Sequence, residues 1–278
     1  SLAYDKEVLN TVGEKYCTDV FSGKMGDDAF DKTLRNYLNE ATHNQLKDQI
    51  DERRFNPEDI MRLYTTLYFT GRWKDEFDKN QNQEDTFHGI KGDTDTSFMT
   101  KEKVDGTIYD LNQAWAYAMD LEAYAGRVDF ILPQGDATIE EVLESPDFAA
   151  YLRNPEDLSF YRRLVNLYVP KFDIQDDLNL KEDLEKLGLS CLFSKDTAEF
   201  NFIKDKNQPA WIDQINQVSR ISLDEDGIEA SNFTELIMNG AAPPPDEIVE
   251  FKLDRPFILL IRGTSSKAIF MAVVNQLG

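Results

Sequence analysis

Two histidines and two cysteines are the side chains of this sequence best suited to bind a transition metal. They are His43, His88, Cys17 and Cys191, and all four lie far apart along the chain. Structural zinc sites usually take their ligands in closely spaced pairs, and this chain has no such pair. We therefore expect no metal site, while one disulfide bridge and two free thiols are equally compatible with the cysteines.

The acidic turn Asp224-Glu-Asp-Gly227 has a faint likeness to a calcium-binding loop. If Gly227 were the loop's glycine, the first ligand position would fall on Ser222 and the twelfth on Phe233, so the pattern fails. The chain also has no Walker loop, no Gly-x-Ser-x-Gly nucleophile elbow and no dinucleotide fingerprint. With 52 Asp and Glu residues, solvated surface charge explains any carboxylate pair better than catalysis does. We expect neither an enzyme nor a cofactor.

The stretch from Asp224 to Pro245 is the most unusual part of the chain. It opens with a turn at Gly227 and ends on three consecutive prolines, Pro243 to Pro245. Prolines cannot donate backbone hydrogen bonds, so this stretch cannot end inside a central strand. Between the two ends lie about fifteen residues without a helix or strand period, and long loops in compact domains are usually functional or disordered.

Composition limits the class of protein and its partners. The chain has 278 residues, of which 41% are hydrophobic, so it can bury the core of one large domain or two small ones. Its net charge of −22 makes nucleic acid and anionic membrane surfaces poor partners. It shows no membrane-spanning run and no signal peptide. The chain starts at Ser1 without an initiator methionine, which suggests a processed product or a fragment.

The elements around the loop follow an α+β pattern. One apolar stripe on a predicted helix comprises Phe30, Leu34, Tyr37, Leu38 and Ala41, and the opposite face, which includes Asp31, is expected at the surface. Further helices are expected at residues 6–16, 139–143, 148–152 and 180–187. A long buried strand is expected at residues 60–70. Shorter strands are expected at 86–88, 96–99, 107–109, 115–119, 128–132, 164–169, 214–223, 248–253, 256–262 and 268–274.

Six stretches resemble signatures of the serpin family of serine protease inhibitors, and they occur in the family's order over the whole chain. They are Leu34–Thr42, Leu67–Phe77 (LYFTGRWKDEF), Val169–Phe172 (VPKF), Leu180–Phe193 (LKEDLEKLGLSCLF), Glu225–Ala230 (EDGIEA) and Arg255–Arg262 (RPFILLIR). The resemblance implies one serpin-like domain over residues 1–278, with a large central, mostly antiparallel sheet, additional sheets and surface helices. Residues 225–247 would form the hinge and an exposed reactive-centre loop.

The resemblance also implies that the domain is incomplete at its N-terminus. In the family a buried helix, with nearby helices and a strand, precedes the position of Ser1, and a sheet face without that helix would expose a large apolar patch. We therefore expect the missing segment to come from a longer precursor, a second chain or another partner.

Serpins act as suicide substrates: a protease cleaves the loop, is trapped as a covalent acyl-enzyme, and the cut loop inserts into the central sheet. The hinge would comprise Glu225, Gly227, Ile228, Glu229 and Ala230. Because strand side chains alternate, the resemblance implies an inward face of Ile228, Ala230, Asn232, Thr234, Leu236 and Met238. None of these is charged, which favours a working inhibitor over a non-inhibitory serpin-fold binding protein or an inactive truncated remnant.

The bond attacked in the family usually follows the residue sixteen positions after the first hinge glutamate, which gives Ala241-Ala242. A small side chain suits an elastase-like serine protease, and such a target implies an extracellular, secreted protein. Gly240-Ala241 and Ile237-Met238 remain alternative bonds.

Other positions of the family pattern are matched or altered. Trp73 occupies the place called the breach. At the shutter, Thr65 stands where the family has asparagine and Gln217 where it has histidine, and Ile228 replaces the commonest hinge threonine. Asn232-Phe-Thr234 spells a glycosylation sequon, and a sugar there would block insertion.

Overall fold

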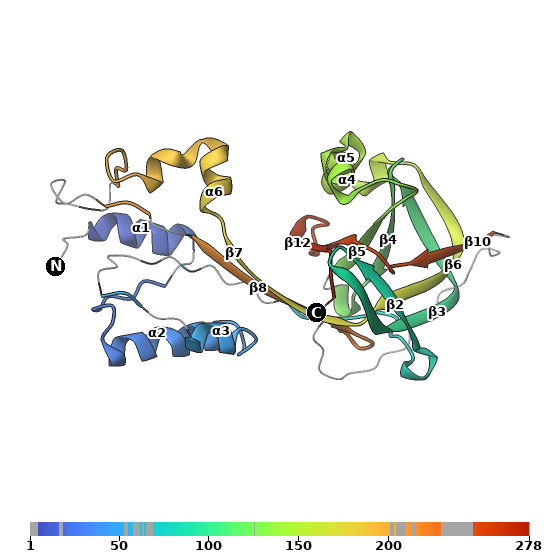
Figure 1. The fold of residues 1–278 in the computed structure, drawn as a ribbon, viewed down its shortest axis with the longest axis horizontal. Helices are drawn as coiled ribbons and strands as arrows, with labels where there is room; N and C mark the ends of the chain where they lie inside the picture. The colour runs from blue at the N-terminus through green and yellow to red at the C-terminus, as the bar shows by residue number, and fades with distance from the viewer. Residues whose placement is uncertain are drawn as a thin grey trace. The chain divides into compact units, whose positions relative to one another are not determined.

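The computed structural model describes residues 5–16, 19–52, 55–57, 62, 64, 69–124, 126–200, 203, 210–212, 215–228 and 247–277. The chain divides into two compact units (Figure 1). Unit 1 comprises residues 1–68 and 175–220, and unit 2 comprises residues 69–174 and 221–278.

The described part of unit 1 contains four α-helices. They are α1 (Lys6–Tyr16), α2 (Asp28–Ala41), α3 (Lys47–Glu52) and the short α6 (Lys181–Leu184). Asp27 caps α2 by accepting hydrogen bonds from the backbone N–H groups of Ala29 and Phe30. Leu38 packs in a small cluster with Leu46 and Ile50.

The polar face predicted for α2 is wrong at two positions, because Asp31 and Asn39 are both buried. Asp31 is buried, because its Oδ1 accepts a hydrogen bond from the backbone N–H of Gly26 at 3.0 Å. A satisfied hydrogen bond offsets part of the cost of burying a carboxylate. After α6, single turns at Glu185–Leu189 and Ser190–Phe193 replace a regular helix, and Gly188 breaks the helical path with φ +93°.

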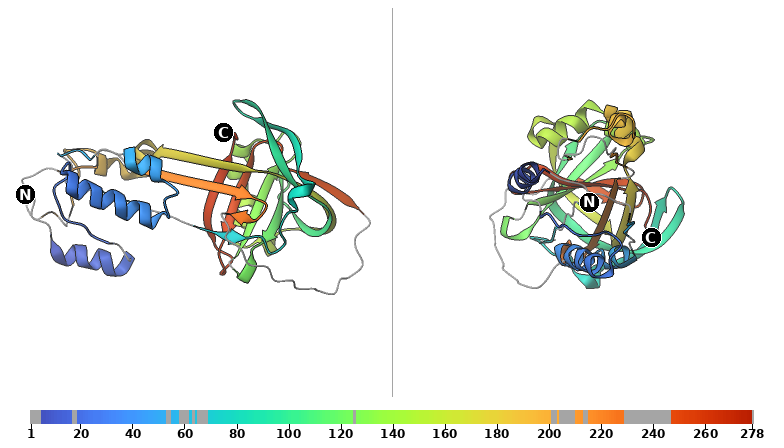
Figure 2. Two further views of the ribbon diagram at one scale, coloured as in Figure 1. Left: turned by 90° about the horizontal axis from the view of Figure 1, so that it is seen from below. Right: turned by 90° about the vertical axis from the view of Figure 1, so that its left-hand side faces the viewer.

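Unit 2 is built on an eight-stranded sheet with the order β10-β6-β3-β4-β5-β11-β12, in which β2 also pairs with β3. All neighbours are antiparallel except β10 and β6, which are parallel. The long β2–β3 hairpin extends from the sheet (Figure 2). The strands are β2 (Gln83–Gly89), β3 (Gly92–Asp110), β4 (Ala114–Asp120), β5 (Arg127–Pro133), β6 (Phe160–Pro170), β10 (Ile248–Lys252), β11 (Phe257–Arg262) and β12 (Ala268–Val274).

Two apolar clusters bury the faces of this sheet. The larger one contains Trp73, Phe130 and Phe257 together with buried apolar residues of β3 and β6 and alternate residues of β11. On the other face, α4 (Ile139–Glu144) and α5 (Pro146–Arg153) pack over Ile131, Ile258 and Leu260 (Figure 1). A capping box between Thr138 and Glu141 begins α4.

A second, four-stranded sheet carries the turn that precedes the predicted loop. Its order is β1-β9-β8-β7, with β1 (Gly71–Arg72), β7 (Phe172–Asn179), β8 (Asn216–Asp224) and β9 (Gly227–Ile228). Short 3-10 turns complete the described part of the chain at Lys79–Gln81, Glu122–Tyr124 and Pro155–Asp157.

The α+β class is confirmed, and most predicted elements lie within two or three residues of their expected positions. The separate strands predicted at 96–99 and 107–109 are wrong, because β3 is one strand of nineteen residues. Asp105 and Gly106 pair within it with β6, and the irregularity lies instead between Lys101 and Val104. Strand β7 was not predicted. Most residues of the strand expected at 60–70 lie outside the described part of the chain, and the next residues, Gly71 and Arg72, form strand β1.

Candidate functional site

The turn at residues 224–227, here called the hinge turn, joins β8 to β9. The Asp224 side chain closes it: Oδ1 accepts the backbone N–H groups of Asp226 at 2.9 Å and of Gly227 at 3.2 Å. Gly227 has φ +145°, and a Cβ there would lie 2.3 Å from the carbonyl oxygen of Gly71. Both the dihedral angle and the close approach therefore require glycine.

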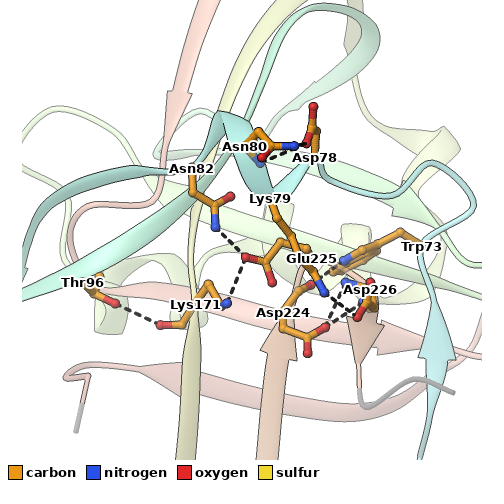
Figure 3. A network of polar contacts seen from close by, with 11 residues as sticks. Trp73, Asp78, Lys79, Asn80, Asn82, Thr96, Lys171, Asp224, Glu225 and Asp226 are labelled. Carbon is orange, nitrogen blue, oxygen red and sulfur yellow. Dashed lines mark hydrogen bonds and ion pairs between the residues drawn. The ribbon is translucent and has the colours of Figure 1, made fainter. Parts of the chain in front are cut away.

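A buried carboxylate anchors the hinge turn (Figure 3). The Glu225 side chain is only 3% exposed, and its Oε1 accepts hydrogen bonds from Lys171 Nζ at 2.9 Å and from Asn82 Nδ2. Burial raises the pKa of the Glu225 carboxyl, but the hydrogen bonds from Lys171 and Asn82 outweigh this effect, so its pKa lies below the ordinary value. Glu225 is thus held as a paired carboxylate at neutral pH.

Lys171 is itself held in place by β3. Its backbone N–H donates to the carbonyl of Ser97 at 2.9 Å, and its carbonyl accepts the Thr96 hydroxyl at 3.2 Å (Figure 3). The ammonium group that pairs with Glu225 therefore projects from a backbone fixed against the eight-stranded sheet.

The indole of Trp73 holds the same turn from the other side (Figure 3). Trp73 is fully buried and lies against Phe77 and Phe130. Its Nε1 donates to the Asp224 carbonyl at 2.9 Å, its backbone N–H donates to the Asp226 carbonyl at 3.2 Å, and the Phe77 N–H donates to the Glu225 carbonyl at 3.2 Å. Residues 73–77 therefore satisfy three consecutive carbonyls of the turn.

Lys79 adds an exposed contact to this arrangement. Its Nζ lies 3.0 Å from Asp226 Oδ2, and this hydrogen bond raises the pKa of Lys79. Exposed pairs of this kind stabilise proteins little. The buried contacts of Glu225 and Trp73 are therefore the main anchors.

Strand β9 lies between two neighbours at the point where the predicted loop begins. Ile228 pairs with Gly71 of β1 on one side and with Leu223 of β8 on the other. Its carbonyl also accepts the Thr70 hydroxyl at 3.2 Å, and its side chain is 3% exposed within the larger core cluster. The first residues after the hinge turn thus already occupy a strand position inside a sheet.

The C-terminal end of the predicted loop enters a different sheet. Glu247 precedes β10, and its Oε2 pairs with Arg163 Nε at 3.1 Å. Further along the two strands, Nδ2 of Asn166 on β6 donates a hydrogen bond to Oε1 of Glu250 on β10 at 2.6 Å. Residues 229–246 therefore connect the four-stranded sheet to the eight-stranded one.

The structure brings Glu225, Gly227, Ile228 and Trp73 together at the hinge turn. Gln217 is an exposed residue of β8. The remaining predicted site positions lie outside the described residues: Thr65, Glu229, Ala230, Asn232, Thr234, Leu236, Met238, Ala241 and Ala242. The roles assigned to all these positions stay predictions.

Sequence reasoning singled out Trp73 but missed the other residues that hold the hinge turn. Lys171 and Phe77 lie in the quoted VPKF and LYFTGRWKDEF motifs, so the motifs could have pointed to them, but no sequence signal marked Asn82 as a partner. Among the described residues, no group of three or more His, Cys, Asp and Glu could hold a metal ion. Cys191 is an exposed free thiol, and Cys17 lies outside the described part of the chain. No described helix is long and apolar enough to cross a membrane.

Comparison with solved structures shows that the chain has the fold of serpins. The chain is similar to a thermophilic serpin, tengpin, in its native state, with a TM-score of 0.81 and 24% identity over 99% of this chain and 70% of that one. It is also similar to a thyroxine-binding globulin in complex with thyroxine, with a TM-score of 0.77 and 21% identity over 99% of this chain and 72% of that one.

Sequence comparison gives the family. Alpha-1-antitrypsin of Sus scrofa is 28% identical over 275 residues, which are 96% of this chain but 61% of that protein. Plasminogen activator inhibitor 1 of Neovison vison is 28% identical over 231 residues, or 78% of this chain and 54% of that protein. The chain thus spans about three-fifths or less of the length of these curated relatives. The family model described as serpin (serine protease inhibitor) matches residues 1–277, and the chain belongs to the serpin family.

Proposed function

We propose that this chain, or the longer protein of which it is part, inhibits a serine protease by loop cleavage, covalent trapping and insertion of the cut loop. The observation that carries the proposal is the position of β9 between β1 and β8. A loop whose first residues are already paired as a strand has a register from which that strand could lengthen after cleavage. Each added residue then gains backbone hydrogen bonds to its neighbours.

The register of β9 supports one route for the insertion. Ile228 pairs with Gly71 and Leu223. Continuing both antiparallel registers places Glu229 opposite Thr70 and Ser222, with Ala230 one residue further along. Because side chains alternate along a strand, the burial of Ile228 supports an inward face made of Ile228 and every second residue up to Met238.

Trapping requires one covalent step on the loop. The protease serine Oγ attacks the carbonyl carbon of Ala241, the bond from that carbon to the Ala242 nitrogen breaks, and the nitrogen leaves as an amine carrying a proton. The Ala241 carbonyl carbon is then joined to the protease as an ester. Insertion would move this ester and the attached protease away from the hinge turn before water hydrolyses it.

The residues at the predicted bond define the target class. The methyl side chain of Ala241 fits a narrow specificity pocket, which favours elastase-like proteases over trypsin-like ones. Gly240-Ala241 and Ile237-Met238 are the alternative bonds. Such a target would place the inhibitor outside the cell.

A second candidate function is presentation of the loop to a partner without trapping. Two observations favour it: the hinge turn is fixed by buried contacts, and one structural neighbour is a globulin solved with bound thyroxine.

A denaturing gel separates these candidates. We would mix the chain, with any N-terminal extension that its gene encodes, with an elastase-type protease. We expect a band at the summed mass and a released peptide that starts at Ala242. Thr234→Arg puts a charge on the inward face and should give cleavage without the complex, whereas Glu235→Arg on the outward face should still form it. Cleavage of the unmodified protein with full protease activity remaining would exclude the inhibitor and favour the binding protein.

A further inference from the structure

One short stretch of chain, residues 73–82, makes most of the contacts that hold the hinge turn, and it is here called the support segment. Four of its residues contact the turn: Trp73, Phe77, Lys79 and Asn82. The structure describes the whole segment, and apart from a bridge to Leu121 and a 3-10 turn at Lys79–Gln81 it has no helix or strand of its own. Contacts with other elements must therefore fix its position.

Strand β3 holds the support segment at two points. The pairing of β3 with β2 ends at Phe98, and its pairing with β4 begins only near its other end. In this interval the Thr100 hydroxyl donates to the Gln81 carbonyl at 2.5 Å, and Lys101 Nζ donates to the Glu76 carbonyl at 2.7 Å. Each bond thus fixes a carbonyl that directly precedes a residue in contact with the hinge turn.

The side chain of Lys101 is only 10% exposed, although lysine is rarely buried. A buried ammonium group needs partners for its charge and for its three donor hydrogens. Besides the Glu76 carbonyl, Nζ lies 2.9 Å from Asp75 Oδ2 and over the ring of Phe77, 5.1 Å from its centroid. Asp75 is 82% exposed, so the ion pair alone contributes little. Lys101 therefore binds three consecutive residues of the support segment through one group.

A β-bulge directly follows Lys101. Strand β3 pairs with β6 up to Lys101 and again from Val104, so that Glu102 and Lys103 lie opposite Asn166 alone. Lys103 has φ +52°, and its backbone N–H donates to Asn166 Oδ1 at 3.0 Å. Bulges bend a strand and redirect its side chains, often next to functional sites. Here the two residues of the bulge are exposed, whereas Lys101 is buried against the support segment.

We propose that Lys101 is a positioning residue for loop insertion: it holds residues 75–77 so that Phe77 fixes the hinge turn, and it thereby sets how fast the cut loop enters the sheet. This inference rests on the proposed function. The Phe77 N–H donates to the Glu225 carbonyl at 3.2 Å, and the hinge turn directly precedes Ile228, from which the strand would lengthen. Water hydrolyses the ester to the protease when insertion is slow. A poorly positioned turn should therefore give more cleaved inhibitor and less trapped protease.

Three variants test whether Lys101 positions the turn. Lys101→Met removes the ammonium group from a side chain of similar length, Lys101→Arg keeps a charged donor, and Lys103→Met is the matched control, because it removes the same charge from an exposed residue of the same strand. Hydrogen exchange measured by NMR follows the Phe77 amide, with Leu259 in β11 as a distant, buried reference. We expect Phe77 to exchange about tenfold faster in Lys101→Met alone, and Leu259 to stay within about twofold in all three variants.

Trapping is measured on the same proteins as the number of inhibitor molecules consumed for each elastase-type protease molecule trapped. We expect this number to rise at least about threefold in Lys101→Met and to stay near that of the unmodified protein in Lys101→Arg and Lys103→Met. Unchanged Phe77 exchange in Lys101→Met, equally faster exchange at Leu259, or no rescue by Lys101→Arg would overturn the proposal. Equal trapping by Lys101→Met and the unmodified protein would overturn it and leave the proposed function intact, whereas no trapping by the unmodified protein would overturn both.

Discussion

The two ends of the predicted reactive loop are attached to the protein in different ways. At the hinge turn, the Glu225 side chain is 3% exposed and Trp73 is fully buried, and both make hydrogen bonds to or from the turn. At the other end, Glu247 is 71% exposed and pairs with Arg163 at the surface. Buried paired charges cost much when one partner is lost, whereas exposed pairs contribute little.

We infer from this difference which end of the loop would set the register of an inserted strand. After cleavage, the segment that follows Ile228 would stay joined to the hinge turn, whose position is fixed by Glu225 and Trp73. The segment that precedes Ile248 would stay joined to β10, which belongs to another sheet. In the proposed mechanism, the strong attachment would therefore fix the starting register of the inserted strand, while the weak attachment would only join the rest of the loop to an edge strand.

Trp73→Ala should have the largest effect on the hinge end. Removing a fully buried tryptophan leaves a cavity and an unpaired Asp224 carbonyl, and we expect a loss of about 3–5 kcal/mol in the free energy of unfolding. Urea denaturation followed by circular dichroism measures this loss. Trp211→Ala is the matched control, because Trp211 is 43% exposed, and its effect should stay within about 1 kcal/mol. Equal losses in the two variants would contradict the anchoring role of Trp73.

Gly227→Ala should have the second-largest effect on the free energy of unfolding. The variant must place a Cβ 2.3 Å from the Gly71 carbonyl oxygen at φ +145°, so the backbone has to shift, and we expect a cost of about 2–3 kcal/mol. Gly135→Ala is the control, because Gly135 also has a positive φ, +58°, but has open space around its Cβ position. Its cost should be about 1 kcal/mol. A cost at Gly135 as large as that at Gly227 would show that the close approach to β1 is unimportant.

Glu225→Gln should have a smaller effect that depends on pH. The substitution replaces a buried, paired carboxylate, and we expect a loss of about 1–3 kcal/mol at pH 7. The folded-state pKa of Glu225 is lowered, so its stabilising contribution is present above the unfolded pKa of about 4.5 and is lost as pH falls through the folded pKa. Urea unfolding at pH 7, 5 and 3 should therefore show the difference from the unmodified protein shrinking in acid. A difference that is constant with pH would exclude the ion pair as its cause.

Arg163→Ala at the β10 end should have the smallest effect. Its partner Glu247 is 71% exposed, so the loss of this pair should stay within about 1 kcal/mol. The same urea titration measures it, and high salt should reduce the difference further. A loss as large as that of Glu225→Gln would remove the proposed distinction between the two ends of the loop.

The elements that could be predicted are those marked by a pattern within their own stretch of sequence. The apolar stripe of α2, the strands β4, β5 and β10 to β12, and the glycine of the hinge turn could be identified from periodicity and turn residues. The continuity of β3 could not, because Asp105 and Gly106 look like a turn in isolation and are held extended only by pairing with β6. The partners of Glu225 also could not be predicted from spacing, since Asn82 and Lys171 reach it from distant segments brought together by the fold.

The central claim is that the cut loop becomes a strand that continues β9 between its two neighbours, and thermal unfolding tests it most directly. The protein would be cleaved with an elastase-type protease, the cut located by mass spectrometry, and unfolding midpoints compared before and after cleavage. We predict a rise of at least about 10 °C, because each kcal/mol gained raises the midpoint of a chain of this size by about 2–4 °C. Thr234→Arg should be cut equally but gain nothing. An unchanged or lower midpoint in the cleaved, unmodified protein would contradict loop insertion.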